Sequence, residues 1–193
     1  MPHHDNDIPL SAFLTFRLNV LAQLANRAGA HWHEQRSGLS LAEWRIIATL
    51  GFFGPLSPSE IANRTLMDKA VISRVKSTLS RKRLIADRPD EQDSRKRRLS
   101  LSDGGQRVYD QTMPQAQSRQ REMISQFSDS ELEALDSAMS RLQAIFERVL
   151  GEGPDVSAVE RPMTAGLAGA DPARQRDPVP SGLAAPRSGA ERD

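Results

Sequence analysis

The 193-residue sequence contains no cysteine, and aromatic residues make up only 5% of it. The lack of cysteine excludes disulfide bonds, thiolate nucleophiles and cysteine-ligated zinc. No apolar run approaches the roughly 20 residues that span a bilayer. The N-terminal stretch MPHHDNDIPL also lacks the basic and apolar regions of a signal peptide. We therefore expect a cytoplasmic protein with a modest helical core, which burial against a second copy would strengthen.

The motifs of common enzyme sites are missing as well. There is no G-x-S-x-G elbow, no G-x-x-x-x-G-K-[S/T] loop and no G-x-G-x-x-G after a strand. His3 and His4 lie in a polar end, residues 1–8, that we expect to be loose. His31 and His33 are two residues apart, a spacing that points side chains in different directions on a helix and does not suit a metal ion. We expect no catalytic residue, no metal and no cofactor.

Positive charge is concentrated in one block, from Arg64 to Arg98. This block holds 12 Lys and Arg against 5 Asp and Glu, a net charge of +7, whereas the whole chain carries +1. One basic block on a near-neutral chain is the electrostatic pattern of a face that binds phosphates. A solvated basic surface is the alternative, since most charge runs have no further role.

The block begins with the pattern of a helix–turn–helix. Ser57 and Glu60 form a capping box around Pro58, which predicts the start of a short helix. Thr65, Leu66 and Met67 would make the turn, and a second helix would run from Asp68 to about Arg81. Its apolar residues recur at spacings of 3 and 4 and leave a polar, basic face. The apolar residues are Val71, Ile72, Val75 and Leu79, and the other face carries Lys69, Ser73, Arg74, Lys76 and Ser77.

A charged hairpin is predicted directly after this second helix. Leu84 and Ile85 begin a short strand, residues 89–94 are polar and typical of a turn, and Arg97–Leu101 returns as an alternating strand. A hairpin at this position is a wing, whose tip can place an arginine in a DNA minor groove.

Three motifs follow one another across this region. They are D-K-x-x-x-S-R from Asp68 to Arg74, D-x-R from Asp93 to Arg95, and L-x-L-S-x-x-G from Leu99 to Gly105, preceded by L-A-E-W-R at residues 41–45. In their order and spacing they resemble the MarR family of bacterial winged-helix regulators, over residues 10–150. One position departs from the family's pattern, because Arg83 stands where most members have a glycine that ends the recognition helix.

The resemblance implies a homodimer that binds a pseudo-palindromic operator, most often as a repressor, and that releases DNA when a small ligand binds. It also implies that Asp93 orients Arg95, the minor-groove arginine of the wing. The ligand would lie between the dimer helices and the DNA-reading region, near Trp32, His33, Trp44 and Arg45. Aromatic walls with a cation suit a small aromatic acid. From the residues alone, Trp44 favours a place in the core and Arg45 a structural bond.

Long helices are predicted on both sides of the DNA-reading region. One begins at Pro9 with an apolar face up to Ala28, and its end would be anchored by Trp32 within the segment 31–34. Ser40 and Glu43 form a second capping box, which opens a helix through Leu50.

Two further helices are predicted after the hairpin. The first begins at Ser102 and Asp103, and its apolar stripe consists of Tyr109, Met113, Ala116, Met123 and Phe127. The second begins at a capping box of Ser128 and Glu131, and its apolar residues alternate by 3 and 4 from Leu132 to Val149. So long a stripe favours contact with a partner protomer over an internal core.

These observations predict an all-α fold with a small β-wing, dimerised through its first and last helices. Residues 9–150 would form the winged helix–turn–helix domain, and residues 151–193, rich in Gly, Pro and Ala, a disordered tail. The expected function is sequence-specific, ligand-responsive regulation of transcription. The expected DNA contacts are Ser57, Ser59, Arg64, Lys69, Ser73, Arg74, Lys76, Ser77, Asp93 and Arg95. A weakly specific architectural DNA-binding protein and a winged-helix module for protein–protein assembly are the alternatives.

Overall fold

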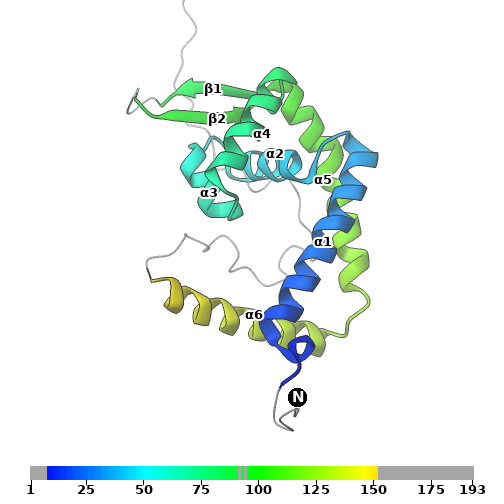
Figure 1. The fold of residues 1–193 in the computed structure, drawn as a ribbon. Coiled ribbons are helices and arrows are strands. Elements are labelled where there is room, and N and C mark those ends of the chain that lie inside the picture. The colour runs from blue at the N-terminus through cyan, green and yellow to red at the C-terminus, as the bar shows by residue number, and fades with distance from the viewer. Residues whose placement is uncertain (1–7, 91–92, 94, 152–193) are drawn as a thin grey trace, which may run out of the picture. The chain divides into compact units, whose positions relative to one another are not determined.

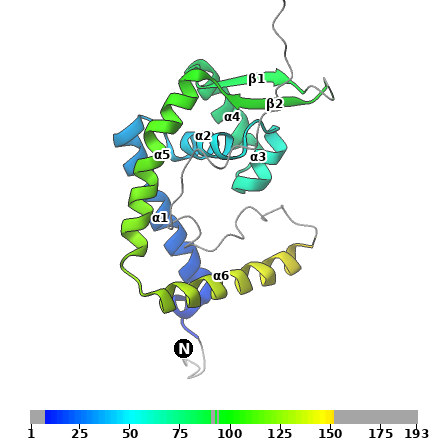
Figure 2. The ribbon, with the colours of Figure 1, turned by 180° about the vertical axis from the view of Figure 1, so that it is seen from behind.

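The computed structural model describes residues 8–90, 93 and 95–151. Within these ranges it contains six α-helices, one short 3-10 helix and a two-stranded antiparallel sheet (Figures 1 and 2). The predicted fold, mostly helical with a β-wing, is confirmed. The predicted loose start and the predicted tail lie outside the described residues, apart from Ile8 and Gly151. None of the helices in the described ranges is both long and apolar enough to cross a bilayer.

The predicted helix–turn–helix and hairpin pack together with the helix before them as one unit, which we call the reading head (residues 41–101). It consists of α2 (Leu41–Phe53), α3 (Pro58–Thr65), α4 (Lys69–Arg81), β1 (Ile85–Pro89) and β2 (Arg97–Leu101). Its fully buried side chains come from all of these elements except β1 and are Ile46, Ile47, Ile61, Ile72, Leu79 and Leu99. The apolar stripe predicted for the second helix of the motif therefore faces this core through Ile72 and Leu79.

The three predicted capping boxes are all present. The hydroxyls of Ser40, Ser57 and Ser128 each accept a hydrogen bond from the backbone N–H three residues on, and the glutamate there accepts one from the serine N–H. Two boundaries differ by one residue from the prediction. Thr65 still belongs to α3, and Asp68 is the residue before α4 rather than part of its first turn.

The hairpin is an antiparallel pair attached to the start of α3. Ile85 pairs with Leu101, Asp87 with Leu99, and Pro89 with Arg97. Leu99 also exchanges two backbone hydrogen bonds with Leu56, just before α3. Because Leu99 is fully buried while the outer end of the hairpin is exposed, the wing is anchored at its base and projects from the head.

Helices α1 (Leu14–Ser37, after a 3-10 turn at Leu10–Ala12) and α5 (Asp103–Ile124) pack against α2. The prediction that α1 ends within residues 31–34 is wrong, because α1 continues to Ser37 and stops at Gly38, whose φ of 63° is left-handed. At the α2–α5 contact the Tyr109 ring occupies the space that a side chain at residue 51 would fill.

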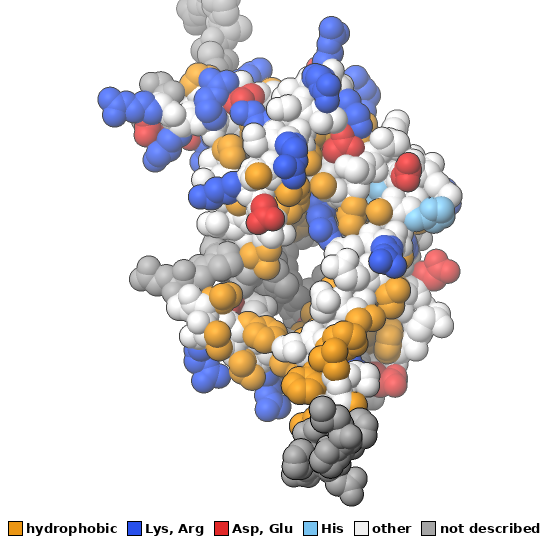
Figure 3. Space-filling view, in the orientation of Figure 1, with side chains coloured by type: hydrophobic (Ala, Val, Ile, Leu, Met, Phe, Trp, Pro, Cys, Tyr) orange, Lys and Arg blue, Asp and Glu red, His pale blue; other side chains and the backbone are white. Residues whose placement is uncertain are grey.

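Much of the apolar surface of α1 and α6 (Asp129–Leu150) is uncovered in the protomer, as the lower part of Figure 3 shows. Met123 and Phe127, predicted to share the stripe of α5, are exposed too, whereas Tyr109, Met113 and Ala116 pack on the core. On α6 only Leu132 is buried. The exposed apolar side chains of the two helices are Leu14, Phe16, Val20, Leu21, Leu24, Leu135, Met139, Ile145, Phe146, Val149 and Leu150.

Helix α4 ends without the glycine that most family members have at position 83. Arg83 itself adopts the left-handed conformation, with φ of 56°. Its N–H donates to the Ser80 carbonyl and the Leu84 N–H donates to the Leu79 carbonyl, both at 3.0 Å. This is the bond pattern of a Schellman motif, in which glycine is favoured because a Cβ is strained there.

We expect Arg83→Gly to raise the free energy of unfolding by about 0.5–1 kcal/mol. The left-handed strain, on the order of 1–2 kcal/mol, is relieved, while the more flexible unfolded chain offsets part of the gain. Urea unfolding at one fixed protein concentration measures the change. Arg81→Gly is the matched control, because Arg81 is an exposed residue inside α4 with ordinary helical backbone and makes the same change of side chain. It should lose about 1 kcal/mol, and equal losses in both variants would contradict the role of strain at residue 83.

Candidate nucleic-acid interface

The outer face of α4 is the most exposed basic surface of the helix–turn–helix. Lys69, Ser73, Arg74 and Ser77 are all exposed there, while Ile72 and Leu79 hold the opposite side of the helix in the core. In Figure 3, lysine and arginine side chains are concentrated over the hairpin and the reading head. The structure therefore brings these four predicted contact residues together on one accessible helix face, of a size that fits a major groove.

The predicted contacts on α3 have more varied surroundings. Ser59 is exposed, and it lines a shallow groove of about 180 Å³ between α3 and α4 together with Lys69, Ser73 and Lys76. The Ser57 hydroxyl is engaged in its capping box. The Arg64 guanidinium lies 4.2 Å from the centre of the Phe53 ring, and Arg64 is half-buried.

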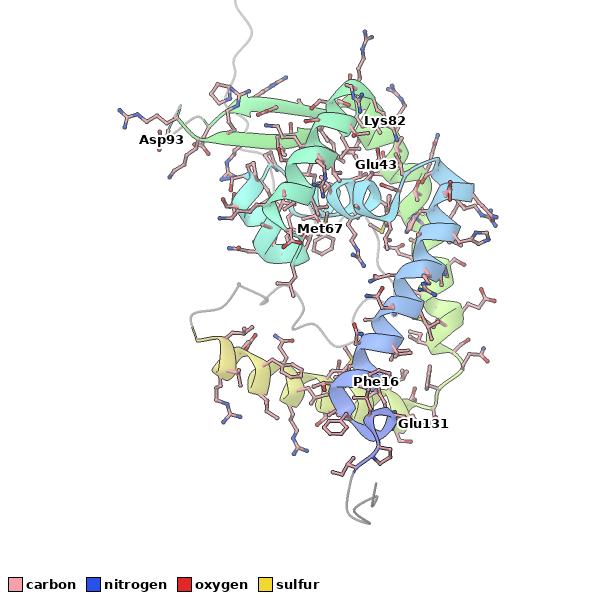
Figure 4. All side chains as sticks on the ribbon, in the orientation of Figure 1. Phe16, Glu43, Met67, Lys82, Asp93 and Glu131 are labelled. Atoms are coloured by element: carbon pink, nitrogen blue, oxygen red, sulfur yellow. The ribbon has the colours of Figure 1, made fainter. Side chains whose placement is uncertain are left out.

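Asp93 and Arg95 lie at the tip of the wing (Figure 4 labels Asp93). The Asp93 carboxylate accepts a hydrogen bond from the backbone N–H of Arg95 at 3.1 Å, and it lies 3.7 Å from the Lys96 Nζ. The Asp93 N–H in turn donates to Asp90. In the described contacts Asp93 thus shapes the backbone from which the exposed Arg95 side chain projects.

Two other wing arginines, which the sequence shows only as part of the basic block, have partners within the head. The Arg97 Nε donates to the Asp87 carboxylate at 2.8 Å. The Arg98 Nε donates to Asp90 at 2.7 Å and its NH1 to the Pro55 carbonyl at 2.8 Å, and the NH1 lies 3.8 Å from Glu60. The hydrogen bond to Asp90 is the main reason why the pKa of Arg98 is raised above its ordinary value.

Lys76, which is predicted to contact the DNA backbone, also has a partner within the head. Its ammonium group forms an ion pair with Asp87 of β1, with 2.5 Å between Nζ and Oδ2. Burial by itself raises the pKa of Asp87, but hydrogen bonds from Lys76 and Arg97 outweigh it and hold the pKa below its usual value. Helix α4 and the wing are therefore joined by one carboxylate.

A second ion pair holds the far end of α4. Lys82 Nζ lies 2.8 Å from Oε1 of Glu43, a side chain at the start of α2 that is almost fully buried (Figure 4). The other carboxylate oxygen completes the Ser40 capping box. Burial raises the pKa of Glu43, yet the bonds from Lys82 and Ser40 lower it overall. Sequence reasoning assigned Glu43 to its cap but had no signal for the distant lysine.

Three of the four predicted ligand residues, Trp32, His33 and Trp44, meet where α1 packs against α2 and α5. The rings of His33 and Trp44 are stacked with centres 5.0 Å apart, and Trp32 packs edge-on against His33 at 4.6 Å. Two α5 residues, absent from the predicted set, complete this aromatic cluster. Tyr109 lies 6.4 Å from Trp44, and the Arg119 guanidinium lies 5.7 Å from Trp32.

Burial within the aromatic cluster differs from residue to residue. Trp44 is 6% exposed, which places it in the core, and His33 is 5% exposed. Arg45 is exposed and donates a 2.6 Å hydrogen bond to the Asn26 amide oxygen rather than to an acid. His31 is exposed and bonded to Gln35, so the two histidines of this segment do not share a site.

His33 remains neutral in the folded protein down to low pH. Burial, followed by the nearby charges of Arg119 and Arg45, lowers its pKa from 6.5 to about 4. The unfolded chain binds a proton on this residue between these two values while the folded protein does not. Stability therefore falls as the pH decreases through this window.

We expect His33→Gln to remove part of this pH dependence. The wild-type free energy of unfolding should decrease more than that of the variant between pH 7 and pH 4, by on the order of 3 kcal/mol. Urea unfolding at several pH values measures both slopes. His31→Gln is the control, because its ring is exposed. A variant slope equal to that of the wild type would show that residue 33 is accessible to protons in the fold.

Comparison with known proteins agrees with this architecture. A sequence model described as "MarR family" matches residues 37–96. A MarR/EmrR family transcriptional regulator from Acinetobacter sp. ADP1 is 25% identical with a TM-score of 0.68, over 73% of this chain and 99% of that one. None of the curated proteins compared with the sequence matches it significantly.

Two further solved structures share the fold at lower identity. MepR of S. aureus, solved as a DNA complex, is 17% identical with a TM-score of 0.62 and covers 72% of this chain and 99% of its own. The PcaV transcriptional regulator of Streptomyces coelicolor, solved with its natural ligand, is 18% identical with a TM-score of 0.59 and covers 72% of this chain and 96% of its own. At these identities the likeness shows the fold alone.

Proposed function

We propose that this chain is a DNA-binding, non-enzymatic transcriptional regulator of the MarR family, and that it acts as a ligand-responsive, homodimeric repressor on a pseudo-palindromic operator. The match of a MarR family model to residues 37–96 and the fold shared with the Acinetobacter regulator support this proposal. The observation that carries this proposal is the exposed face of α4 beside a wing that ends in Arg95. A helix with one buried side and Lys, Arg and Ser on the other suits the major groove, and a basic wing tip suits the flanking minor groove.

Within this proposal the residues have separate tasks. Lys69, Ser73, Arg74 and Ser77 contact base edges or nearby phosphates, since they share the exposed face of α4. Ser59 and Arg64 contact the DNA backbone from α3, while Ser57 and Lys76 serve it indirectly, through the cap and through Asp87. Arg95 enters the minor groove, and Asp93 shapes the turn that presents it.

The homodimer is supported by the uncovered apolar faces of α1 and α6. Eleven large apolar side chains of these helices are at least 39% exposed. Single exposed apolar residues are common on monomeric proteins, but so many on two helices indicate an interaction surface. A dimer formed through these faces would carry two recognition helices, one for each half-site of an operator whose half-sites are about one helical turn apart. A dimer whose two reading heads occupy the operator would block transcription. This function places the protein in the cytoplasm, where bacterial DNA lies.

The ligand proposal rests on the aromatic cluster. Since His33 is neutral, Arg119 and Arg45 are the cations available at this junction for a carboxylate, and Trp32, which is only half-buried, offers an aromatic surface. A small aromatic acid fits this chemistry. That PcaV, a protein of the same fold, was solved with its natural ligand is compatible with this assignment.

We expect Arg95→Ala to weaken binding to the preferred duplex by more than about tenfold at moderate salt, because an arginine in a narrow minor groove contributes both charge and shape recognition. The preferred duplex is first selected from a random library with the wild-type protein. Fluorescence anisotropy then compares it with a scrambled duplex at several salt concentrations.

Arg36→Ala is the control for loss of one exposed arginine outside the reading head, because Arg36 lies in the last turn of α1, beyond its exposed apolar face. Its affinity should stay within about twofold of wild type. Discrimination by the wild type of roughly 10³-fold or more supports a regulator. Weak, equal binding to both duplexes would favour the architectural alternative. Absence of salt-dependent binding would favour an assembly module.

We expect aromatic carboxylates to change the tryptophan fluorescence at submillimolar concentrations, because both tryptophans of the chain, Trp32 and Trp44, lie in the aromatic cluster. Arg119→Gln should raise the apparent Kd about tenfold or more by removing a cation from the ligand's carboxylate. Neutral aromatic amides of the same shape serve as matched ligands. Fluorescence that stays constant up to millimolar acid would refute the ligand proposal and leave the DNA proposal standing.

A further inference from the structure

Asp87 is an acidic residue within the most basic block of the chain. It lies in β1 on the same side of the hairpin as Ile85, since residues two apart on a strand share a face. Its cross-strand partner is Leu99, which is fully buried. The alternating pattern thus places a carboxylate on the inward face of the wing, where the hairpin leaves the core and approaches α4.

Each oxygen of this carboxylate is used by a different DNA-reading element. Oδ2 pairs with Lys76 of α4, and Oδ1 accepts the hydrogen bond of Arg97 from β2, the diagonal neighbour on the opposite strand. Arg97 also donates through NH2 to the Asp87 backbone carbonyl at 2.9 Å. The Asp87 side chain is only 22% exposed, so solvent screens these bonds less than at an open surface.

This bridge is the only ion pair between α4 and the hairpin among the residues that the structure describes. It neutralises two cations that would otherwise attract phosphates, and a carboxylate beside DNA is itself unfavourable for binding. Charge attraction to DNA therefore does not account for Asp87. What the bridge does supply is a fixed separation between the helix and the wing.

We infer that Asp87 is a positioning residue for DNA recognition, which holds the recognition helix and the wing at the separation needed to occupy a major groove and the adjacent minor groove together. This inference rests on the proposed function. A loose wing would still contribute charge, so non-specific binding would remain. Simultaneous fit to both grooves of one sequence would be lost, because the two elements would have to be ordered during binding.

The sign of the effect of Asp87→Asn distinguishes positioning from charge. Removing a negative charge should strengthen binding to any duplex if charge alone matters. Positioning predicts that affinity for the preferred duplex falls about tenfold while affinity for the scrambled duplex is unchanged or rises, so that the specificity ratio drops. Anisotropy titrations of the full chain on both duplexes give this ratio directly.

Asp103→Asn is the matched control, because Asp103 is an exposed carboxylate directly after the hairpin and no ion pair joins it to another described residue. It removes the same charge, and its specificity ratio should equal that of the wild type. Asp87→Glu is the second variant. It keeps the charge but lengthens the side chain. Positioning therefore predicts a lower specificity ratio for this variant, whereas charge alone predicts an unchanged ratio. Thermal unfolding confirms that each variant is folded.

Lys76→Met tests whether the bridge acts as a unit. Combined with Asp87→Asn it should lower the specificity ratio no further than the more damaging single change. Equal tightening on both duplexes in Asp87→Asn and Asp103→Asn would overturn the inference while leaving the proposed function intact. A wild-type protein that does not discriminate between the duplexes would overturn both.

Discussion

The burial of helix α2 is the constraint on which the rest of the described structure depends. Ile46, Ile47 and Leu50 have almost no exposed surface, and α2 contacts α1, α3, α4, α5 and β2. Burial of three such side chains contributes on the order of 5–9 kcal/mol. Close approach also depends on Gly51, because any side chain there would occupy the position of the Tyr109 ring. The recognition helix and the wing are thus held in place by a helix that contains none of the predicted DNA contacts.

The first turn of α2 contacts both the end of α4 and the aromatic cluster. Glu43 pairs with Lys82 at the end of α4, and the next residue, Trp44, stacks between His33 and Tyr109. Since adjacent residues of one helical turn move as a unit, a displacement of Trp44 also displaces the partner of the recognition helix. A ligand at the aromatic cluster would alter DNA affinity only if it bound one position of α2 more tightly than another.

The positive charge of the head serves two purposes that composition cannot separate. Lys76, Lys82, Arg97 and Arg98 pair with carboxylates of the head, whereas Lys69, Arg74 and Arg95 are exposed at its surface. Partly buried ion pairs cost desolvation, so they contribute modestly to stability and strongly to geometry. The paired cations define how the helix and wing are presented, and the exposed ones remain available to phosphates and bases.

Much of this architecture could be predicted from the sequence because it depends on local interactions. Capping boxes, the helix–turn–helix spacing and the alternation of the hairpin all depend on residues within a few positions of one another, and each was recognisable. The left-handed conformation of Arg83 was not, since it requires the completed bonds from residues 83 and 84 to the end of α4. The partners of Lys76, Lys82 and Arg98 were equally hidden. Arg98, for example, bonds a carbonyl 43 positions away, and only packing of the whole head around α2 decides which distant carboxylate or carbonyl a flexible cation reaches.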